Sequence, residues 1–358
     1  MRRPHRASVA GIAGCVGCAL GLCALALILL GRFVSPVRAA PQVRAVNIAL
    51  RQAVGRVVFC ITKDTMIVAA VDDGAAAALR APNATPPRMP AIAPLGAGRV
   101  AVVLGATDWT RDDGQPVLLD EEMPALARKV FSATEKLDPF DQSANDIESI
   151  GVTILEFVRP FVTGIHYKLD LAADEPLIEV LIGGFTDGYG FELWDLKYRV
   201  AQRNLGNDYW DTRPLRPSYF QLYPPEKGQP RTFVEAQYPA RLEPLALARA
   251  AQSDPAVAPI RNSSPQINEA VTAILNGESN KANTRPTEDF LRLAIPVVAG
   301  AQAKLAVGAV DQQQRFQWLL APENAPAIPA ETSAQPGQPA TGEPQRPSLR
   351  RAGPATTR

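Results

Sequence analysis

The sequence predicts an α+β domain in which β-hairpins and helices occupy separate blocks. Three segments carry this prediction: residues 57–73, 92–109 and 177–200 each hold two apolar runs joined by a short polar or glycine-rich turn. Two helical patterns stand between the second and third hairpins, and two more follow the third. Blocks of this kind are typical of α+β domains and not of domains with alternating strands and helices.

The first hairpin has the sequence VVFCITKDTMIVAAVDD, with Lys63-Asp64 at its turn and Asp72-Asp73 at its end. Residues 44–54 precede it and read as a short helix or an extended lead-in. The second hairpin turns at Gly96-Ala97-Gly98 and continues into the buried-looking run VAVVLGA. Residues 74–90 and 111–117 are predicted to be loops.

Two helices are expected next, at residues 120–134 and 146–161, separated by Pro139. The first has apolar residues at helical spacing and three acidic residues in its first turn, where the helix dipole favours them. The second has an apolar face and a plausible cap at Asn145 or Asp146.

The third hairpin, residues 177–185 and 191–200, turns at Asp187-Gly188, a preferred turn dipeptide. Residues 204–244 hold many prolines and aromatic residues and read as an irregular insertion. Helices are then expected at residues 264–275, capped by Ser264, and at 287–303, where Pro296 should kink the chain. Residues 304–320 are predicted to form a last strand.

The N-terminus reads as a targeting segment. Three arginines precede an apolar run at residues 9–30, and Val37-Arg38-Ala39 fits a small-residue cleavage rule before Ala40. Residues 1–39 are therefore either a cleaved signal peptide or a signal anchor retained in the membrane through residues 9–30. In both cases the rest of the chain is expected outside the cytoplasm: periplasmic, secreted or anchored facing outward.

Charge and cysteine content exclude several classes of function. Without residues 1–39 the chain keeps 32 basic and 36 acidic residues, a net charge of −4. Such a domain has no electrostatic footprint for nucleic acid. Cys60 is then the only cysteine and His166 the only histidine. An internal disulfide and a Cys/His metal site are therefore excluded, and no cofactor is expected. Residues 322–358 are rich in Pro, Ala, Gln and Thr and are predicted to be a disordered tail.

The order of elements resembles that of the proteasome-like, N-terminal nucleophile (Ntn) hydrolase family. Three local matches carry the resemblance over residues 44–320: KDTMIVAAVDD, RVAVVLGATDW and EVLIGGFTDGYGFELWDL. The resemblance implies a four-layer αββα sandwich of two antiparallel sheets between helix layers, spanning residues 40–321. Segment 204–244 departs from the family pattern. Many members of the family form rings, so the resemblance is compatible with a homo-oligomer. The ring-forming surfaces cannot be recognised in this sequence.

The resemblance also implies where catalytic residues would stand. Active members expose a Thr, Ser or Cys at the start of the first strand, with its own α-amine as the base. Aligning Lys63-Asp64 with the family's turn places this position near Gly55 or Arg56, neither of which can attack a carbonyl. The supporting acidic position falls at Asp72, or at Val71 in a strict register, and the lysine position falls near Arg88. Arginine cannot serve as a neutral base.

Three hypotheses follow. The first is an exported proteasome-like protein without hydrolase activity that acts as a binding or assembly module for a protein or peptide partner. The second is an active Ntn-type amidohydrolase or peptidase with another nucleophile, for which Cys60 is the candidate if cleavage exposes it. Free cysteines in strands are more commonly buried packing residues. The third is a different α+β fold whose element order matches by chance.

Overall fold

A computed structural model describes residues 51–72, 86–110, 114–131, 139–225, 227, 231–300, 303–326 and 328. All of them belong to one compact unit, residues 47–358. The described residues form two antiparallel sheets, a two-stranded ribbon and helices, which confirms the α+β class. The predicted targeting segment lies outside the described residues, as does nearly all of the predicted tail. No helix within the described ranges is both long and apolar enough to cross a membrane.

Sheet A has seven strands, ordered β1-β5-β7-β8-β11, with β4 and β6 also paired to β5. All of its pairings are antiparallel. Its strands are β1 (Arg51–Ala53), β4 (Ala91–Gly96), β5 (Arg99–Thr110), β6 (Pro116–Leu118), β7 (Ile178–Thr186), β8 (Gly190–Tyr198) and β11 (Ser218–Tyr223). The predicted second and third hairpins, β4–β5 and β7–β8, are both present in this sheet.

Sheet B has five strands in the order β12-β2-β3-β13-β14, again all antiparallel. They are β12 (Phe233–Tyr238), β2 (Gly55–Ile61), β3 (Thr65–Asp72), β13 (Lys304–Asp311) and β14 (Phe316–Leu320). The predicted first hairpin is β2–β3, closed at the register Ile61↔Met66. A separate ribbon pairs β9 (Val200–Gly206) with β10 (Tyr209–Pro214).

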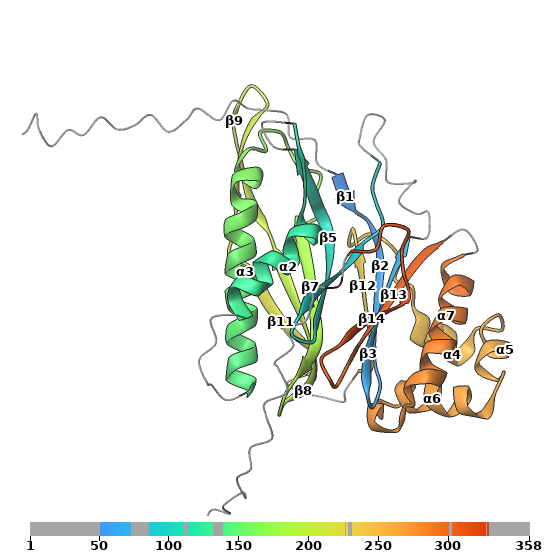
Figure 1. The fold of residues 1–358 in the computed structure, drawn as a ribbon. Helices are drawn as coiled ribbons and strands as arrows, with labels where there is room; N and C mark the ends of the chain where they lie inside the picture. The colour runs from blue at the N-terminus through green and yellow to red at the C-terminus, as the bar shows by residue number, and fades with distance from the viewer. Residues whose placement is uncertain are drawn as a thin grey trace, which may run out of the picture. The chain divides into compact units, whose positions relative to one another are not determined.

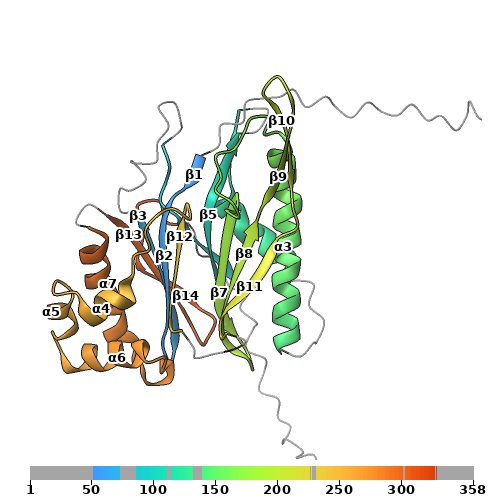
Figure 2. The ribbon, with the colours of Figure 1, turned by 180° about the vertical axis from the view of Figure 1, so that it is seen from behind.

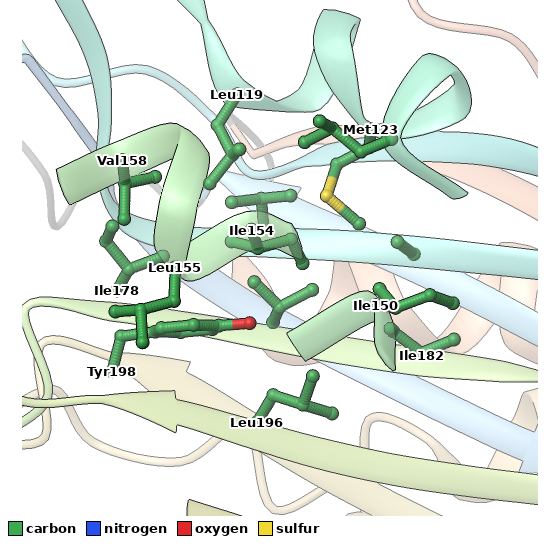
Figure 3. Packing of buried hydrophobic residues seen from close by; sticks show 14 of the residues in the cluster. Leu119, Met123, Ile150, Ile154, Leu155, Val158, Ile178, Ile182, Leu196 and Tyr198 are labelled. Carbon is green, nitrogen blue, oxygen red and sulfur yellow. The ribbon is translucent and has the colours of Figure 1, made fainter. Parts of the chain in front are cut away.

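Helices α2 (Leu119–Phe131) and α3 (Pro139–Thr163) pack on one face of sheet A. Apolar side chains from α2, α3, β5, β7 and β8 form one buried cluster there, part of which Figure 3 shows at close range. The helical spacing of the buried residues in α2 and α3 produces the apolar stripe that each helix presents to the sheet. They include Met123, Ile150, Ile154 and Val158.

Helices α4 (Leu247–Ser253), α5 (Ala258–Arg261), α6 (Pro265–Leu275) and α7 (Thr284–Ala299) pack against sheet B. In Figures 1 and 2 these helices and the pair α2 and α3 appear on opposite sides of the two sheets. The remaining faces of the sheets meet in a third apolar cluster. Strand β2 shows the alternation that this requires: Val57 and Phe59 point to sheet A, whereas Val58 and Cys60 point to the helices.

Four expectations about element boundaries are wrong. Helix α3 starts at Pro139 and not at a cap near residue 146, because proline is well tolerated at the first helical position. Residues 116 and 117, the end of the predicted loop 111–117, belong to β6 (Pro116–Leu118). The last predicted strand is a hairpin, β13–β14, and helix α7 begins at Thr284 instead of residue 287.

The segment 204–244, predicted to be an irregular insertion, is largely β-structure. It contains the last three residues of β9 and all of β10, β11 and β12. Strand β11 is an edge of sheet A and β12 an edge of sheet B. Prolines lie at strand ends or between strands here, and edge strands tolerate them.

The predicted cap of α6 is confirmed and gives a first stability prediction. The Ser264 hydroxyl accepts a hydrogen bond from the Ile267 N–H at 3.1 Å. Ser264→Ala leaves that N–H without its partner and should lower the free energy of unfolding by about 1 kcal/mol. Urea unfolding followed by circular dichroism measures this, and Ser264→Asn, another good cap, should restore most of the loss.

Candidate functional site

The structure places Gly55, the first expected nucleophile position, where no side chain fits. A Cβ at Gly55 would lie 2.3 Å from the Val71 carbonyl oxygen and 2.9 Å from Pro90 Cδ. The neighbouring Arg56 donates from Nε to the Glu243 carbonyl oxygen at 2.5 Å. The start of β2 is therefore a closely packed strand end.

Arg88, at the expected lysine position, belongs to a network of ion pairs. It donates to Asp108 at 2.8 Å, to Thr107 at 3.1 Å and to Asp120 at the start of α2. Burial by itself lowers the pKa of Arg88, but the Asp120 and Asp108 carboxylates outweigh this effect and raise it. Arg88 thus ties strand β5 to helix α2 as a permanent cation.

Asp72 and Cys60 are the remaining predicted site residues. Asp72 is half-buried at the end of β3, opposite Lys304 of β13. Cys60 is fully buried near the end of β2, between Phe233 and Ile67 of the neighbouring strands, and burial raises the pKa of its thiol. A chain starting at Cys60 would lose most of β2, so this geometry favours a packing role.

A groove of about 1300 Å³ lies elsewhere, along the edge strand β12. Its floor is the continuous segment 231–238, which includes the whole of β12. One wall comes from β7, β8 and β11 of sheet A, and the other from α4 and the end of α6. Figure 2 shows β12 beside β2 with these elements around it.

Strand β12 pairs with β2 along one edge, and no described strand pairs with the other. The Ile61 N–H donates to the Thr232 carbonyl oxygen, so residues 61 and 232 occupy a hydrogen-bonded position of the ladder. Because hydrogen-bonded pairs alternate in an antiparallel ladder, the backbone groups of Phe233, Glu235 and Gln237 point to the outer edge. The groove therefore presents a row of backbone donors and acceptors.

Three charged residues lie together on the sheet A wall of the groove. Lys197 Nζ is 3.2 Å from Asp195 Oδ2 and 3.6 Å from Glu179 Oε1. Glu179 is directly opposite Lys197 in the β7–β8 ladder, and Asp195 precedes Lys197 by two residues on the same face. Both carboxyl groups are more than nine-tenths buried. We call Glu179 and Asp195 the carboxyl pair.

Near neutral pH the carboxyl pair keeps a proton that two solvent-exposed carboxyl groups would have lost. Burial raises the pKa of Glu179 to about 8, with the negative charge of Asp195 adding to the effect and Lys197 opposing it. Asp195 Oδ1 receives no hydrogen bond from any N–H or hydroxyl group of the described residues. The group beside it is the Glu179 carboxyl, which donates only when protonated. We therefore assign a shared proton to the pair.

Tyr238 of β12 completes this part of the groove. Its side chain is 1% exposed, and its hydroxyl has no hydrogen-bond partner among the described residues. Burial and the neighbouring Glu175 and Glu179 raise the pKa of the Tyr238 hydroxyl, so it remains a donor. Glu175 is already satisfied by the N–H groups of Ala172 and Ala240. The Tyr238 hydroxyl thus has no partner among the described residues, and Asp195 Oδ1 depends on the proton of Glu179.

The raised pKa of Glu179 predicts that stability falls with rising pH. The folded state keeps a proton that the unfolded state loses near its ordinary pKa of 4.5, so stability is fully present below that pH. It should fall between pH 4.5 and about 8, by up to about 1.4 kcal/mol per pH unit.

Glu179→Gln, which keeps the hydrogen-bonding shape without titrating, should flatten this slope. Urea midpoints measured at pH 5, 6, 7, 8 and 9 test this expectation, with Asp187→Asn in the exposed β7–β8 turn as the control. Equal slopes in wild type and Glu179→Gln would contradict the shared proton.

None of the site residues predicted from the sequence, Cys60, Asp72 and Arg88, lines the groove. Glu179, Asp195 and Lys197 sit in strands whose neighbours are apolar, and charge inside an otherwise buried strand was the available signal. The free edge of β12 has no such signal, because this half-buried strand mixes polar and apolar residues as a loop does. His166 lies apart from the groove wall, stacked on Tyr209 with ring centroids 4.6 Å apart.

Across the described ranges, no group of three or more His, Cys, Asp or Glu side chains is placed to hold a metal ion. A scan against protein-family models and a search of curated proteins both found no match to this chain. A functional proposal for this protein must therefore be based on the groove along β12.

Proposed function

We propose that this protein is a noncatalytic binding module, exported from the cytoplasm, that takes an extended peptide segment of a partner in the β12 groove. The unpaired outer edge of β12 along the groove floor supports this most strongly. An extended peptide can add to such an edge by main-chain hydrogen bonds, with its alternate side chains received by the groove walls.

The fold within this proposal is a proteasome-like αββα sandwich. The layering of helices, sheet A, sheet B and helices agrees with it. The absence of hydrolase activity is supported by the packed Gly55, the ion-paired Arg88 and the buried Cys60. Intact mass of the mature protein is a direct check, because a chain starting at Cys60 would revive the hydrolase alternative.

Panning the purified full-length chain with a display library of random nonapeptides tests peptide binding. Enriched peptides should lose at least about tenfold in affinity for Gln237→Pro, which removes one outward N–H of β12 and leaves the β2 pairing intact. Leu205→Pro is the matched control, since Leu205 is exposed in the ribbon and skipped by the β9–β10 register.

N-methylation of the enriched peptide, one residue at a time, supplies a second criterion. Only every second N–H of an added strand faces β12, so binding should be lost at alternate positions. A peptide that tolerates methylation everywhere, or that binds Gln237→Pro as well as wild type, would contradict strand addition.

A further inference from the structure

We propose that the groove selects an extended peptide carrying a lysine or arginine side chain, whose cationic group is received by the carboxyl pair Glu179 and Asp195. This inference rests on the proposed peptide-binding function and specifies its ligand. A strand added to the outer edge of β12 would extend sheet B, so its alternate side chains would face sheet A. The wall that they face contains the carboxyl pair.

The shared proton stands in for a missing cation at the pair. Two carboxyl groups have one ammonium group, Lys197, beside them, and the other described residues place no second cation at salt-bridge distance, so the charges balance only while the pair keeps its proton. Tyr238 faces the pair from β12, and Glu175 lies just before β7. Glu175 and Glu235, which also line the groove, are engaged by backbone N–H groups at both carboxylate oxygens. Asp174 also lines the groove but is exposed, so Glu179 and Asp195 are the buried carboxyl groups left for a ligand.

Two buried atoms, one dependent on the shared proton and one without a partner among the described residues, show what the ligand would supply. Asp195 Oδ1 lacks a permanent donor, and a lysine ammonium or an arginine guanidinium is a donor. The Tyr238 hydroxyl lacks an acceptor, and a peptide carbonyl is an acceptor. A basic peptide therefore complements both atoms, whereas a neutral or acidic side chain would leave the pair dependent on its proton.

Ligand binding should then release that proton. In the empty groove the Glu179 carboxyl is mostly protonated at pH 7, since its pKa is about 8. A cation beside the pair favours the doubly ionised form, so the proton goes to the buffer as the cation binds. Binding heats measured in two buffers of different ionisation enthalpy count the protons released.

The experiment uses the peptide enriched by panning, synthesised with Lys, Arg, norleucine or Glu at each position in turn. Titration calorimetry of the full-length chain at pH 7 should find one position at which Lys or Arg binds at least about tenfold tighter than norleucine. At that position about one proton should be released per peptide. Glu179→Gln should abolish the release and reduce the preference for Lys, and Asp195→Asn should reduce the preference. Asp187→Asn should change neither.

The outcomes separate the two proposals. Peptides that bind and depend on Gln237, but show no cation preference and no proton release, overturn the present inference and leave the binding function standing. A library that yields no binding peptide overturns both. A preference for Glu would reverse the assigned charge and overturn the inference.

Discussion

Replacing Arg99 by methionine should lower the free energy of unfolding by about 3–5 kcal/mol. Arg99 Nη1 lies 2.6 Å from Glu192 Oε1, and the Glu192 side chain is fully buried beneath α3. Methionine keeps much of the volume of Arg99 and removes its charge. The carboxylate would then be buried without a cation, which is what makes the loss large.

The pH dependence of the Arg99→Met effect provides its control. Burial alone raises the pKa of Glu192, but Arg99 and hydrogen bonds from Ser143, Thr186 and Trp194 outweigh it, so the net shift is downward. A lowered pKa stabilises the fold above the ordinary value of 4.5, and this contribution is lost as pH falls through the folded value. The difference between wild type and Arg99→Met should therefore be widest near neutral pH and shrink in acid.

Chemical denaturation at pH 7 and pH 4 measures both expectations. The double variant Arg99→Met/Glu192→Leu removes the stranded charge and should recover most of the lost stability. A loss below about 1 kcal/mol for Arg99→Met at pH 7, the level of an exposed ion pair, would show that the site is solvated.

Gly55→Thr, which introduces the nucleophile that active Ntn hydrolases carry, should unfold the strand end and yield no hydrolase. Its Cβ would lie 2.3 Å from the Val71 carbonyl oxygen, and a backbone atom cannot move aside without disturbing the β2–β3 ladder. Overpacking at such a position costs about 3 kcal/mol or more. Gly55→Ala should lose nearly as much, because the clash is at Cβ.

Thermal unfolding and a fluorogenic amide assay test Gly55→Thr, with Gly206→Ala as the matched control. A Cβ at Gly206 meets nothing within 4 Å, although its φ is +103°, so any loss there reports backbone conformation alone. A stable Gly55→Thr protein, or one that cleaves amides, would contradict the packing argument and favour the enzyme hypothesis.

The three hairpins could be predicted because each has apolar runs around an unmistakable turn, and both strands of each pair are buried. The edge strands β11 and β12 could not, since half-buried edge strands mix polar, aromatic and proline residues as loops do. The start of helix α6 can be predicted because Ser264 and Pro265 mark it. The start of helix α3 is missed because Pro139 resembles a helix breaker, whereas it is the first residue of the helix.

The candidate site was harder to predict than the fold. Residues 55, 72 and 88 came from a resemblance, and the structure shows one of them packed and another ion-paired. The carboxyl pair needs Glu179 and Asp195 from different strands to face the same space as Tyr238, a residue of the other sheet. Such a meeting depends on tertiary packing, which local sequence patterns do not record.

Strands β11 and β12 follow each other in the chain, yet each closes the edge of a different sheet. The chain therefore changes sheets in the connection between Tyr223 and Phe233, and the described residues Pro225, Lys227, Arg231 and Thr232 of that connection line the groove, while the buried cores are formed mainly by other strands. Insertions and deletions in this connection could alter the width of the groove without rebuilding either core.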